Sequence, residues 1–231
     1  MARKLYELVG IEDDRPFSPY CWRTRMALAH KQLPADRVPW HFTDTGAIAF
    51  SGQGKVPVLV DGDKTVFDSW TIAGYLDDTY PDKPSLFDGL TGKAMAAFFN
   101  NWVDNVIHAP LARIILLDIH EHIGDKDKAY FRTSREERFG TTLEAIVADP
   151  EAKIAAFRQA LHPVRMTVRQ QPYLGGAAPR YADYILFGAF AWARAISRRP
   201  LLAADDPVFA WRARMLEVHG GIAGKAKGYP V

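Results

Sequence analysis

Three short motifs in the first third of the chain carry residues that could do chemistry. The first, Ser18-Pro19-Tyr20-Cys21, stands at the predicted start of a helix. A helix N-terminus offers unpaired backbone N–H groups and a partial positive charge, and both favour a bound thiolate or carboxylate. Ser-Pro also begins many helices that have no such role, with Ser18 as a cap. The motif alone leaves both interpretations open.

The other two motifs are Gly54-Lys55-Val56-Pro57-Val58 and Phe67-Asp68-Ser69-Trp70. Proline cannot donate to a strand ladder, so Pro57 indicates either an edge strand or a cis Val56–Pro57 bond. Asp68 and Ser69 are ordinary helix caps. The backbone N–H and hydroxyl of Ser69 could equally bind the carboxylate of a ligand.

Other candidate groups are weaker. His120 and His122 are two residues apart and would face different sides of a helix, so we expect no metal site. Arg132, Arg135 and Arg138 recur every three residues beside glutamates, which predicts a solvated, salt-bridged helix face.

The elements around the motifs predict a small α/β sheet. Strand-like runs cover 4–9, 37–42, 56–60 and 65–67, and the Asp-Gly-Asp turn at 61–63 joins the last two as an antiparallel hairpin. Apolar spacing predicts helices over 21–31 and 70–80. A Pro- and Gly-rich stretch, 81–92, follows as a linker.

After the linker the pattern is entirely helical. We expect one long helix over 94–119, broken near Pro110 because proline lacks the N–H of the helix ladder. Further helices are predicted over 134–148, 151–170, 182–196 and 207–217. The predicted domains are residues 1–82 and 93–231, joined by a linker over 83–92.

Composition narrows the class of protein. Lys and Arg number 29 against 27 Asp and Glu, a net charge of +2, which argues against a nucleic-acid partner. The longest apolar run, 184–193, is about half of the ~20 residues that a membrane helix needs. The first residues do not resemble a signal peptide. With Cys21 as the single cysteine, we expect a protein of the reducing cytoplasm without membrane contact.

Taken together, the three motifs and the helical second half resemble the glutathione transferase family. That family has a thioredoxin-like α/β domain followed by an all-α domain. The resemblance is closest to the bacterial β-etherase and fungal etherase-like branch, on FSPYCWRTRMALAHK, VPVLVDGDKTVFDSWTIAGYLDDTYPDKPSLFDG and YLGGAAPRYADY. It implies a transferase that activates the thiol of glutathione for attack on a hydrophobic, aromatic electrophile, and the branch suggests β-aryl ethers as such substrates.

The resemblance also implies roles for individual residues. Ser18 would be the catalytic residue and donate a hydrogen bond to the sulfur, because a serine hydroxyl is too weak an acid to serve as the base. Val56, before the cis Pro57, would hold the cysteinyl part of glutathione through its backbone. Asp68 and Ser69 would hold the γ-glutamyl end. Lys55, helped by Gln53, would contact the glycyl carboxylate.

An aromatic electrophile pocket is expected between the two domains, from candidates Tyr20, Trp22, Trp102, Tyr130 and Phe131. Alternatively, Trp102 packs in the hydrophobic core and does not line the pocket. Members of the family are usually dimers, so we expect a homodimer. Two other functions stay open: a glutathione- or ligand-binding module without catalysis, and a thiol oxidoreductase that uses Cys21. Ser18 replaces the first Cys of the redox motif Cys-Pro-Tyr-Cys, which favours thiol activation over disulfide exchange.

One departure concerns folding. The family's last core helix usually begins with Ser or Thr three residues before an Asp, but here Arg180 precedes Asp183. The reciprocal capping box is therefore incomplete, and Asp183 must cap this helix alone or with backbone help.

Overall fold

The computed structural model describes residues 3–230, so residues 1, 2 and 231 of the two predicted domains lie outside it. Its N-terminal part is a four-stranded sheet in the order β2-β1-β3-β4. The strands are β1 (Arg3–Leu8), β2 (Asp36–Trp40), β3 (Val58–Asp61) and β4 (Lys64–Phe67). β1 runs parallel to β2 and antiparallel to β3, and β3 and β4 form the predicted hairpin.

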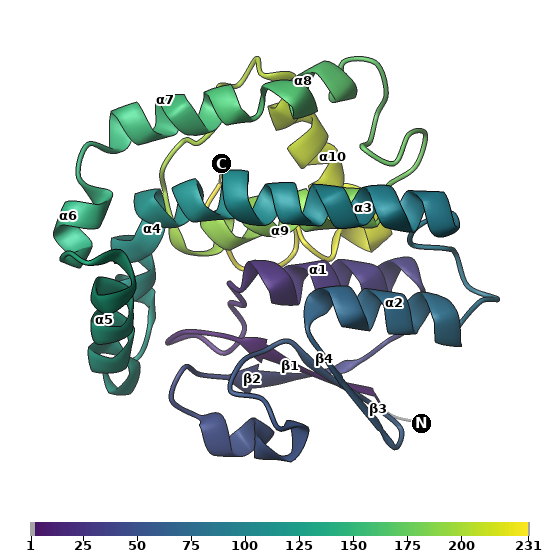
Figure 1. Ribbon diagram of the computed structural model, residues 1–231, viewed down its shortest axis with the longest axis horizontal. Coiled ribbons are helices and arrows are strands. Elements are labelled where there is room, and N and C mark those ends of the chain that lie inside the picture. The colour runs from purple at the N-terminus through teal and green to yellow at the C-terminus, as the bar shows by residue number, and fades with distance from the viewer. Residues whose placement is uncertain (1–2, 231) are drawn as a thin grey trace.

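Two helices, α1 (Pro19–His30) and α2 (Ser69–Thr79), lie side by side on the sheet, with the C-terminal helices on the side away from the strands (Figure 1). A 3-10 helix, η1 (Thr45–Ser51), follows β2. Both faces of α1 are covered, because it packs against the sheet on one side and against α9 (Tyr181–Ile196) on the other.

The register of the sheet brings the three sequence motifs to one end. Tyr6 in β1 is opposite Val58 in β3, and Val58 is opposite Phe67 in β4. Since both pairs are antiparallel, the chain leaves β1 and β4 at the same end at which it enters β3. Residues 18–21, 54–57 and 68–69 follow or precede these strand ends, so all three motifs meet there.

The remaining helices form the C-terminal part. They are α3 (Leu90–Trp102), the π-helix η2 (Val103–His108), α4 (Ala109–His122), α5 (Asp125–Phe139), α6 (Leu143–Val147), α7 (Pro150–Ala160), α8 (His162–Val168), α9 and α10 (Pro207–Gly221). Within residues 3–230, no helix has the length and apolar character needed to cross a membrane.

Three expected helices have different bounds. The long helix over 94–119 runs from Leu90 to His122, and its irregularity is the π-helical segment just before Pro110. The prediction of one helix over 134–148 is wrong, because α5 ends at Gly140, whose φ of 70° is left-handed. The predicted helix over 151–170 is two helices, which meet just before Pro163.

Asp183 caps α9 in place of the missing Ser or Thr. Its carboxylate accepts hydrogen bonds from the backbone N–H groups of Leu174, Gly175 and Arg180 and from the indole of Trp211, at 2.7–3.0 Å. The guanidinium of Arg180 turns away and pairs with Asp88. One buried carboxylate therefore anchors the start of α9 and the loop before it.

Gly188 sets how closely α9 can approach the start of α1. A Cβ at this position would lie 2.5 Å from the carbonyl oxygen of Pro19 and 3.2 Å from the side chain of Arg23. Because a backbone atom blocks that space, only glycine fits without moving α1. The position of the first turn of α1, which carries Ser18, thus depends on Gly188.

Candidate active site

Ser18 is the N-cap of α1 and is buried, with 4% of its surface exposed. Its Oγ accepts the N–H of Cys21 at 3.2 Å, which leaves the hydroxyl proton free to be donated. The next residue, Pro19, has no N–H. The N–H of Tyr20 makes no hydrogen bond with residues 3–230, so the first turn presents one hydroxyl and one backbone donor.

Val56 and Pro57 lie across from this turn, and the peptide bond between them is cis. Val56 precedes β3 and is half-buried. Among the described residues, neither its N–H nor its C=O has a hydrogen-bond partner. An extended peptide segment could therefore pair with Val56 as a short antiparallel strand would.

Asp68 and Ser69 open α2. Oδ1 of Asp68 accepts the N–H groups of Trp70 and Thr71 at 3.0 and 2.9 Å, so Asp68 is the cap of this helix. Its φ of 68° and ψ of 131° form a sparsely populated backbone conformation, of the kind that clusters at functional sites. Oδ2 accepts no bond from residues 3–230 and remains available.

Ser69 is 2% exposed, and its backbone oxygen accepts the hydroxyl of Tyr181 at 2.6 Å. This bond ties the start of α2 to α9. In the described part of the chain the hydroxyl and N–H of Ser69 have no partner, so they can bind a carboxylate at the positive end of the helix. Lys55 is exposed and Gln53 is half-exposed nearby in sequence, before β3.

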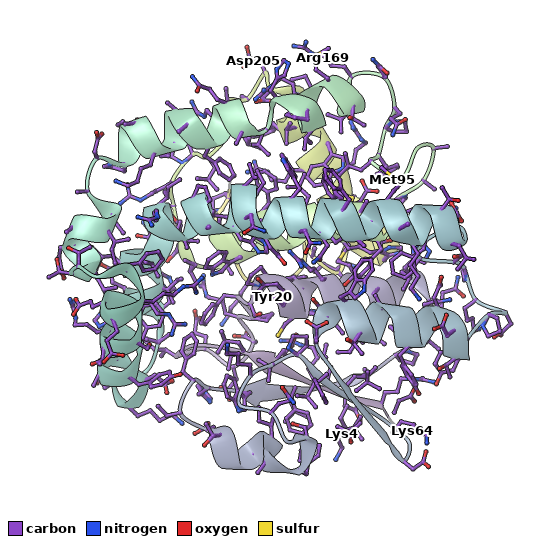
Figure 2. The ribbon with its side chains drawn as sticks, in the orientation of Figure 1. Lys4, Tyr20, Lys64, Met95, Arg169 and Asp205 are labelled. Carbon is purple, nitrogen blue, oxygen red and sulfur yellow. The ribbon has the colours of Figure 1, made fainter. Side chains whose placement is uncertain are left out.

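A cavity of about 510 Å³ extends from Ser18 into the helical part of the molecule. Figure 2 shows Tyr20, one of its lining residues, at the N-terminal end of α1, between the sheet and the C-terminal helices. Its wall also includes charged and aromatic residues from both parts of the chain, namely Phe42, Asp104, His108, Arg113, Phe131, Arg135, Arg138, Phe139 and Trp192. The cavity is thus built from both parts of the chain, as the sequence predicts for an electrophile pocket.

Of the five predicted pocket residues, Tyr20 and Phe131 line this cavity. Trp22 does not: it is 2% exposed, and its indole donates to the carbonyl of Pro16 at 3.0 Å in the core. Trp102 stacks on Phe99 instead, with ring centroids 5.4 Å apart. Tyr130 is 50% exposed and lies behind Phe42, 6.4 Å between ring centroids, rather than at the cavity wall.

Apart from Phe131, the cavity residues from η2, α4, α5 and α9 were missed, because a helical pattern does not tell which side faces a neighbouring domain. Phe42 could have been found. It follows β2, which is parallel to β1, so it leaves the sheet at the same end as the three motifs.

One wall of the cavity holds a charged cluster that links the two parts of the chain. Arg23, which is buried in α1, donates to Asn100 at 2.8 Å and to Asp104 at 2.7 Å. Nδ1 of His108 lies 3.2 Å from the same carboxylate. Burial lowers the pKa of His108 to about 4 against the opposing effect of Asp104, so its imidazole is neutral at pH 7. The charge of Asp104 is therefore matched by Arg23.

Cys21 is fully buried beneath the motif. Burial raises the pKa of its thiol to about 12, against the smaller opposing effect of the neighbouring Ser18 side chain. At neutral pH this thiol is protonated and has no access to solvent, which is the environment of a structural cysteine rather than of a reactive one.

Comparison with known proteins gives the same family for both halves of the chain. Residues 17–79 match the profile of the glutathione S-transferase N-terminal domain, and residues 94–206 match that of the C-terminal domain. A glutathione S-transferase-like protein ustS of Aspergillus flavus is 31% identical over 140 residues, 55% of this chain and 50% of that protein. A probable glutathione S-transferase GSTU6 of Oryza sativa is 26% identical, over 85% of this chain and 80% of its own length.

Solved structures of glutathione transferases have the same fold as this chain. Glutathione transferase GSTFuA2 of Phanerochaete chrysosporium superposes with a TM-score of 0.77 at 26% identity, covering 96% of this chain and 93% of that one. The glutathione S-transferase CsGST63524 of Ceriporiopsis subvermispora, solved in complex with glutathione, has the same fold, with a TM-score of 0.83 at 24% identity and coverage of 95% and 96%. The chain has the fold of these proteins and belongs to the glutathione S-transferase family.

Proposed function

We propose that the protein is a glutathione transferase that ionises the thiol of glutathione at Ser18 and directs it at an aromatic or otherwise hydrophobic electrophile. One observation carries the proposal. Unused hydrogen-bonding groups of Ser18, Val56 and Ser69 meet at one end of the sheet, beside a cavity that reaches Ser18. In this account residues 1–82 bind glutathione and residues 93–231 supply the wall of the electrophile cavity.

Glutathione is an extended, anionic tripeptide, and the groups present fit it. Val56, held by the turn at Pro57, offers one N–H and one C=O to the cysteinyl backbone. Ser69 offers its N–H and hydroxyl to the γ-glutamyl carboxylate at the positive end of α2. The free Oδ2 of Asp68 is suited to the ammonium group, and Lys55, with Gln53 as a helper, to the glycyl carboxylate.

Thiol activation at Ser18 is quantitatively reasonable. A thiol with a pKa of ~8.5 is only a few per cent ionised at pH 7, and lowering that value by ~2 units requires about 2.7 kcal/mol. A hydrogen bond to a charged group contributes roughly 1.5–3 kcal/mol. The N-terminus of α1 adds about 0.3–1 kcal/mol. The hydroxyl of Ser18 and the free N–H of Tyr20 are together sufficient.

The reaction that follows is a nucleophilic displacement. The sulfur forms a bond to the electrophilic carbon, the leaving group departs with the electron pair of the broken bond, and the thiol proton passes to solvent. With a β-aryl ether the leaving group is a phenolate. The motifs shared with the etherase-like branch suggest such ethers as one substrate class, and the aromatic wall formed by Tyr20, Phe42 and Phe131 is compatible with an aryl group.

The oxidoreductase alternative has little support, because Cys21 is buried and protonated. The test of the proposed function must also exclude a module that binds glutathione without catalysis.

We further propose a cytoplasmic homodimer. α3 carries exposed apolar side chains at Leu90, Met95 and Phe98, which are 87%, 62% and 67% exposed. A second copy could cover this surface.

Turnover of two electrophile classes tests the proposal. Purified protein is incubated with glutathione and either an aryl halide or a β-aryl ether model compound, and thioether formation is followed. We expect turnover of at least one class above the uncatalysed rate, with Ser18→Ala slower at pH 7. If the wild type binds glutathione but turns over neither class and leaves the thiol un-ionised, the protein is a binding module.

A further inference from the structure

Three arginines line the cavity beside Ser18 without a carboxylate partner. Arg113 on α4 and Arg135 and Arg138 on α5 all belong to its wall. Among residues 3–230, none of the three forms an ion pair. Arg132, on the same helix, pairs with Glu136 and Glu144 at 2.8 and 2.9 Å. Arg135 and Arg138 thus lack the ion pairs predicted for this face of α5 and lie at the cavity, where Arg138 is solvent-exposed as predicted and Arg135 is half-buried.

Aromatic rings hold these guanidinium groups. Arg135 lies over Phe131 and Phe42, at 4.5 and 5.2 Å from the ring centroids. Arg113 and Arg138 lie over Phe139, at 4.8 and 5.6 Å. Such contacts orient a guanidinium group but leave its in-plane N–H donors free. Arg135 uses one of these donors, to Ser134 at 2.8 Å.

The positive charge is not compensated within the cavity. Among residues 3–230, Asp104 is the one acidic residue in its wall, and Arg23 already lies 2.7 Å from that carboxylate. His108 is neutral at pH 7, as described above. Burial lowers the pKa of Arg135 from its ordinary value and the neighbouring charge of Arg138 adds to this, while the nearby hydroxyl of Tyr130 acts in the opposite direction.

We infer that the electrophile of this enzyme carries an anionic group, in particular a carboxylate, together with its aromatic ring. The ring would pack against Phe42, Phe131 and Phe139, and the carboxylate would be held by Arg135 with Arg138 and Arg113. A planar guanidinium matches a carboxylate through two parallel hydrogen bonds. The inference rests on the proposed function, because it specifies the substrate of the same site.

A matched pair of substrates tests it. The pair is 4-chloro-3,5-dinitrobenzoate and its methyl ester, which share the ring and the leaving group. In both, a C–S bond to glutathione forms, the C–Cl bond breaks, chloride leaves and the thiol proton goes to solvent. The value of kcat/KM for each is divided by its uncatalysed rate with glutathione at the same pH, because the ester is intrinsically more reactive.

We expect the normalised kcat/KM of the wild type to favour the benzoate over its ester by about tenfold to a hundredfold, the range for a charge-assisted hydrogen bond. Arg135→Gln should remove most of that preference while the KM for glutathione stays the same. Arg132→Gln is the matched control on the same helix and should keep the preference. Equal normalised rates in the wild type, or equal loss for both substrates in Arg135→Gln, would overturn the inference.

A binding measurement separates this inference from the proposed function. Calorimetry with 3,5-dinitrobenzoate, which has no leaving group, reports on the cavity without any reaction. If neither chloro compound turns over, and a β-aryl ether is not cleaved either, the proposed function fails. The anion inference then stands only if 3,5-dinitrobenzoate binds more tightly than its methyl ester and Arg135→Gln removes the difference. Equal binding of the two compounds would contradict it.

Discussion

Replacing Ser18 with alanine separates thiol activation from glutathione binding. The change removes the hydroxyl proton that would face the sulfur and leaves the groups at Val56 and Ser69 untouched. If that hydrogen bond contributes roughly 1.5–3 kcal/mol, the thiol pKa in the complex rises by about 1–2 units. Starting from a pKa of about 6.5 in the complex, the rate at pH 7 should then fall by about threefold to 25-fold, with nearly unchanged affinity for glutathione.

The pH dependence of the transferase rate shows whether Ser18 acts by ionising the thiol. If Ser18 activates the thiol as proposed, the thiolate is the major form at neutral pH in the wild type, whereas in Ser18→Ala it forms only as the pH approaches the ordinary thiol value of ~8.5. The difference in rate between the two proteins should therefore shrink as the pH rises to about 9. Ultraviolet absorbance of the thiolate, titrated in each complex, gives the two pKa values directly.

Ser18 is also a helix cap, so its loss has a structural effect that needs a control. Alanine removes the bond to the N–H of Cys21 and should cost about 1 kcal/mol of stability, whereas glycine at an N-cap costs only a few tenths. Ser18→Gly and Ser18→Ala should thus raise the thiol pKa equally while differing in stability. Ser18→Thr should keep both properties. An unchanged pKa in both hydroxyl-free variants would refute the role of Ser18 and favour the N–H of Tyr20.

Four further outcomes are expected. Gly188→Ala should lower the melting temperature and the transferase rate together, since the new Cβ displaces the carbonyl of Pro19 and with it the first turn of α1; a rate equal to that of the wild type would contradict this coupling. Asp183→Ala should lower the free energy of unfolding in urea by more than about 3 kcal/mol. The reason is that four donors, three backbone N–H groups and one indole, lose their shared acceptor. A loss below about 1 kcal/mol would show that water replaces the carboxylate. Burial lowers the pKa of His30 to about 4, so the unfolded chain takes up a proton at a higher pH than the folded protein does. The free energy of unfolding should therefore be largest above about pH 6.5 and fall from there toward pH 4. Thermal unfolding across this range measures it, and a stability that rises on acidification would contradict the prediction. Cys21→Ala should keep most of the transferase rate because the thiol is buried and protonated; loss of a disulfide-reducing activity in this variant would instead support the oxidoreductase alternative.

The sheet and the meeting of the motifs were predictable because strand patterns and turn residues are local. The Asp-Gly-Asp turn specifies the hairpin, and the hairpin places residues 54–57 next to Asp68. The split of the expected helix over 134–148 was harder to see. Gly140 is left-handed here, but a lone glycine inside a helical pattern is also tolerated at a cost of about 1 kcal/mol.

The cavity wall was the least predictable part, because it depends on tertiary packing. Trp22 belongs to a helix buried on both sides, so spacing could not tell which of its residues reach the site. Arg132 and Arg135 have the same pattern in sequence, yet one pairs with glutamates and the other lies over Phe42 and Phe131. That difference follows from how α5 docks beside the segment after β2, at Phe42 and Thr43, which no local pattern specifies.

A crystal structure of the protein soaked with glutathione tests the central claim most directly. The account predicts a glutathione sulfur within hydrogen-bond distance of the Ser18 Oγ, with the cysteinyl backbone paired to Val56 and the γ-glutamyl carboxylate at Ser69. Glutathione bound elsewhere, or bound here with its sulfur turned away from Ser18 and from the cavity, would contradict it.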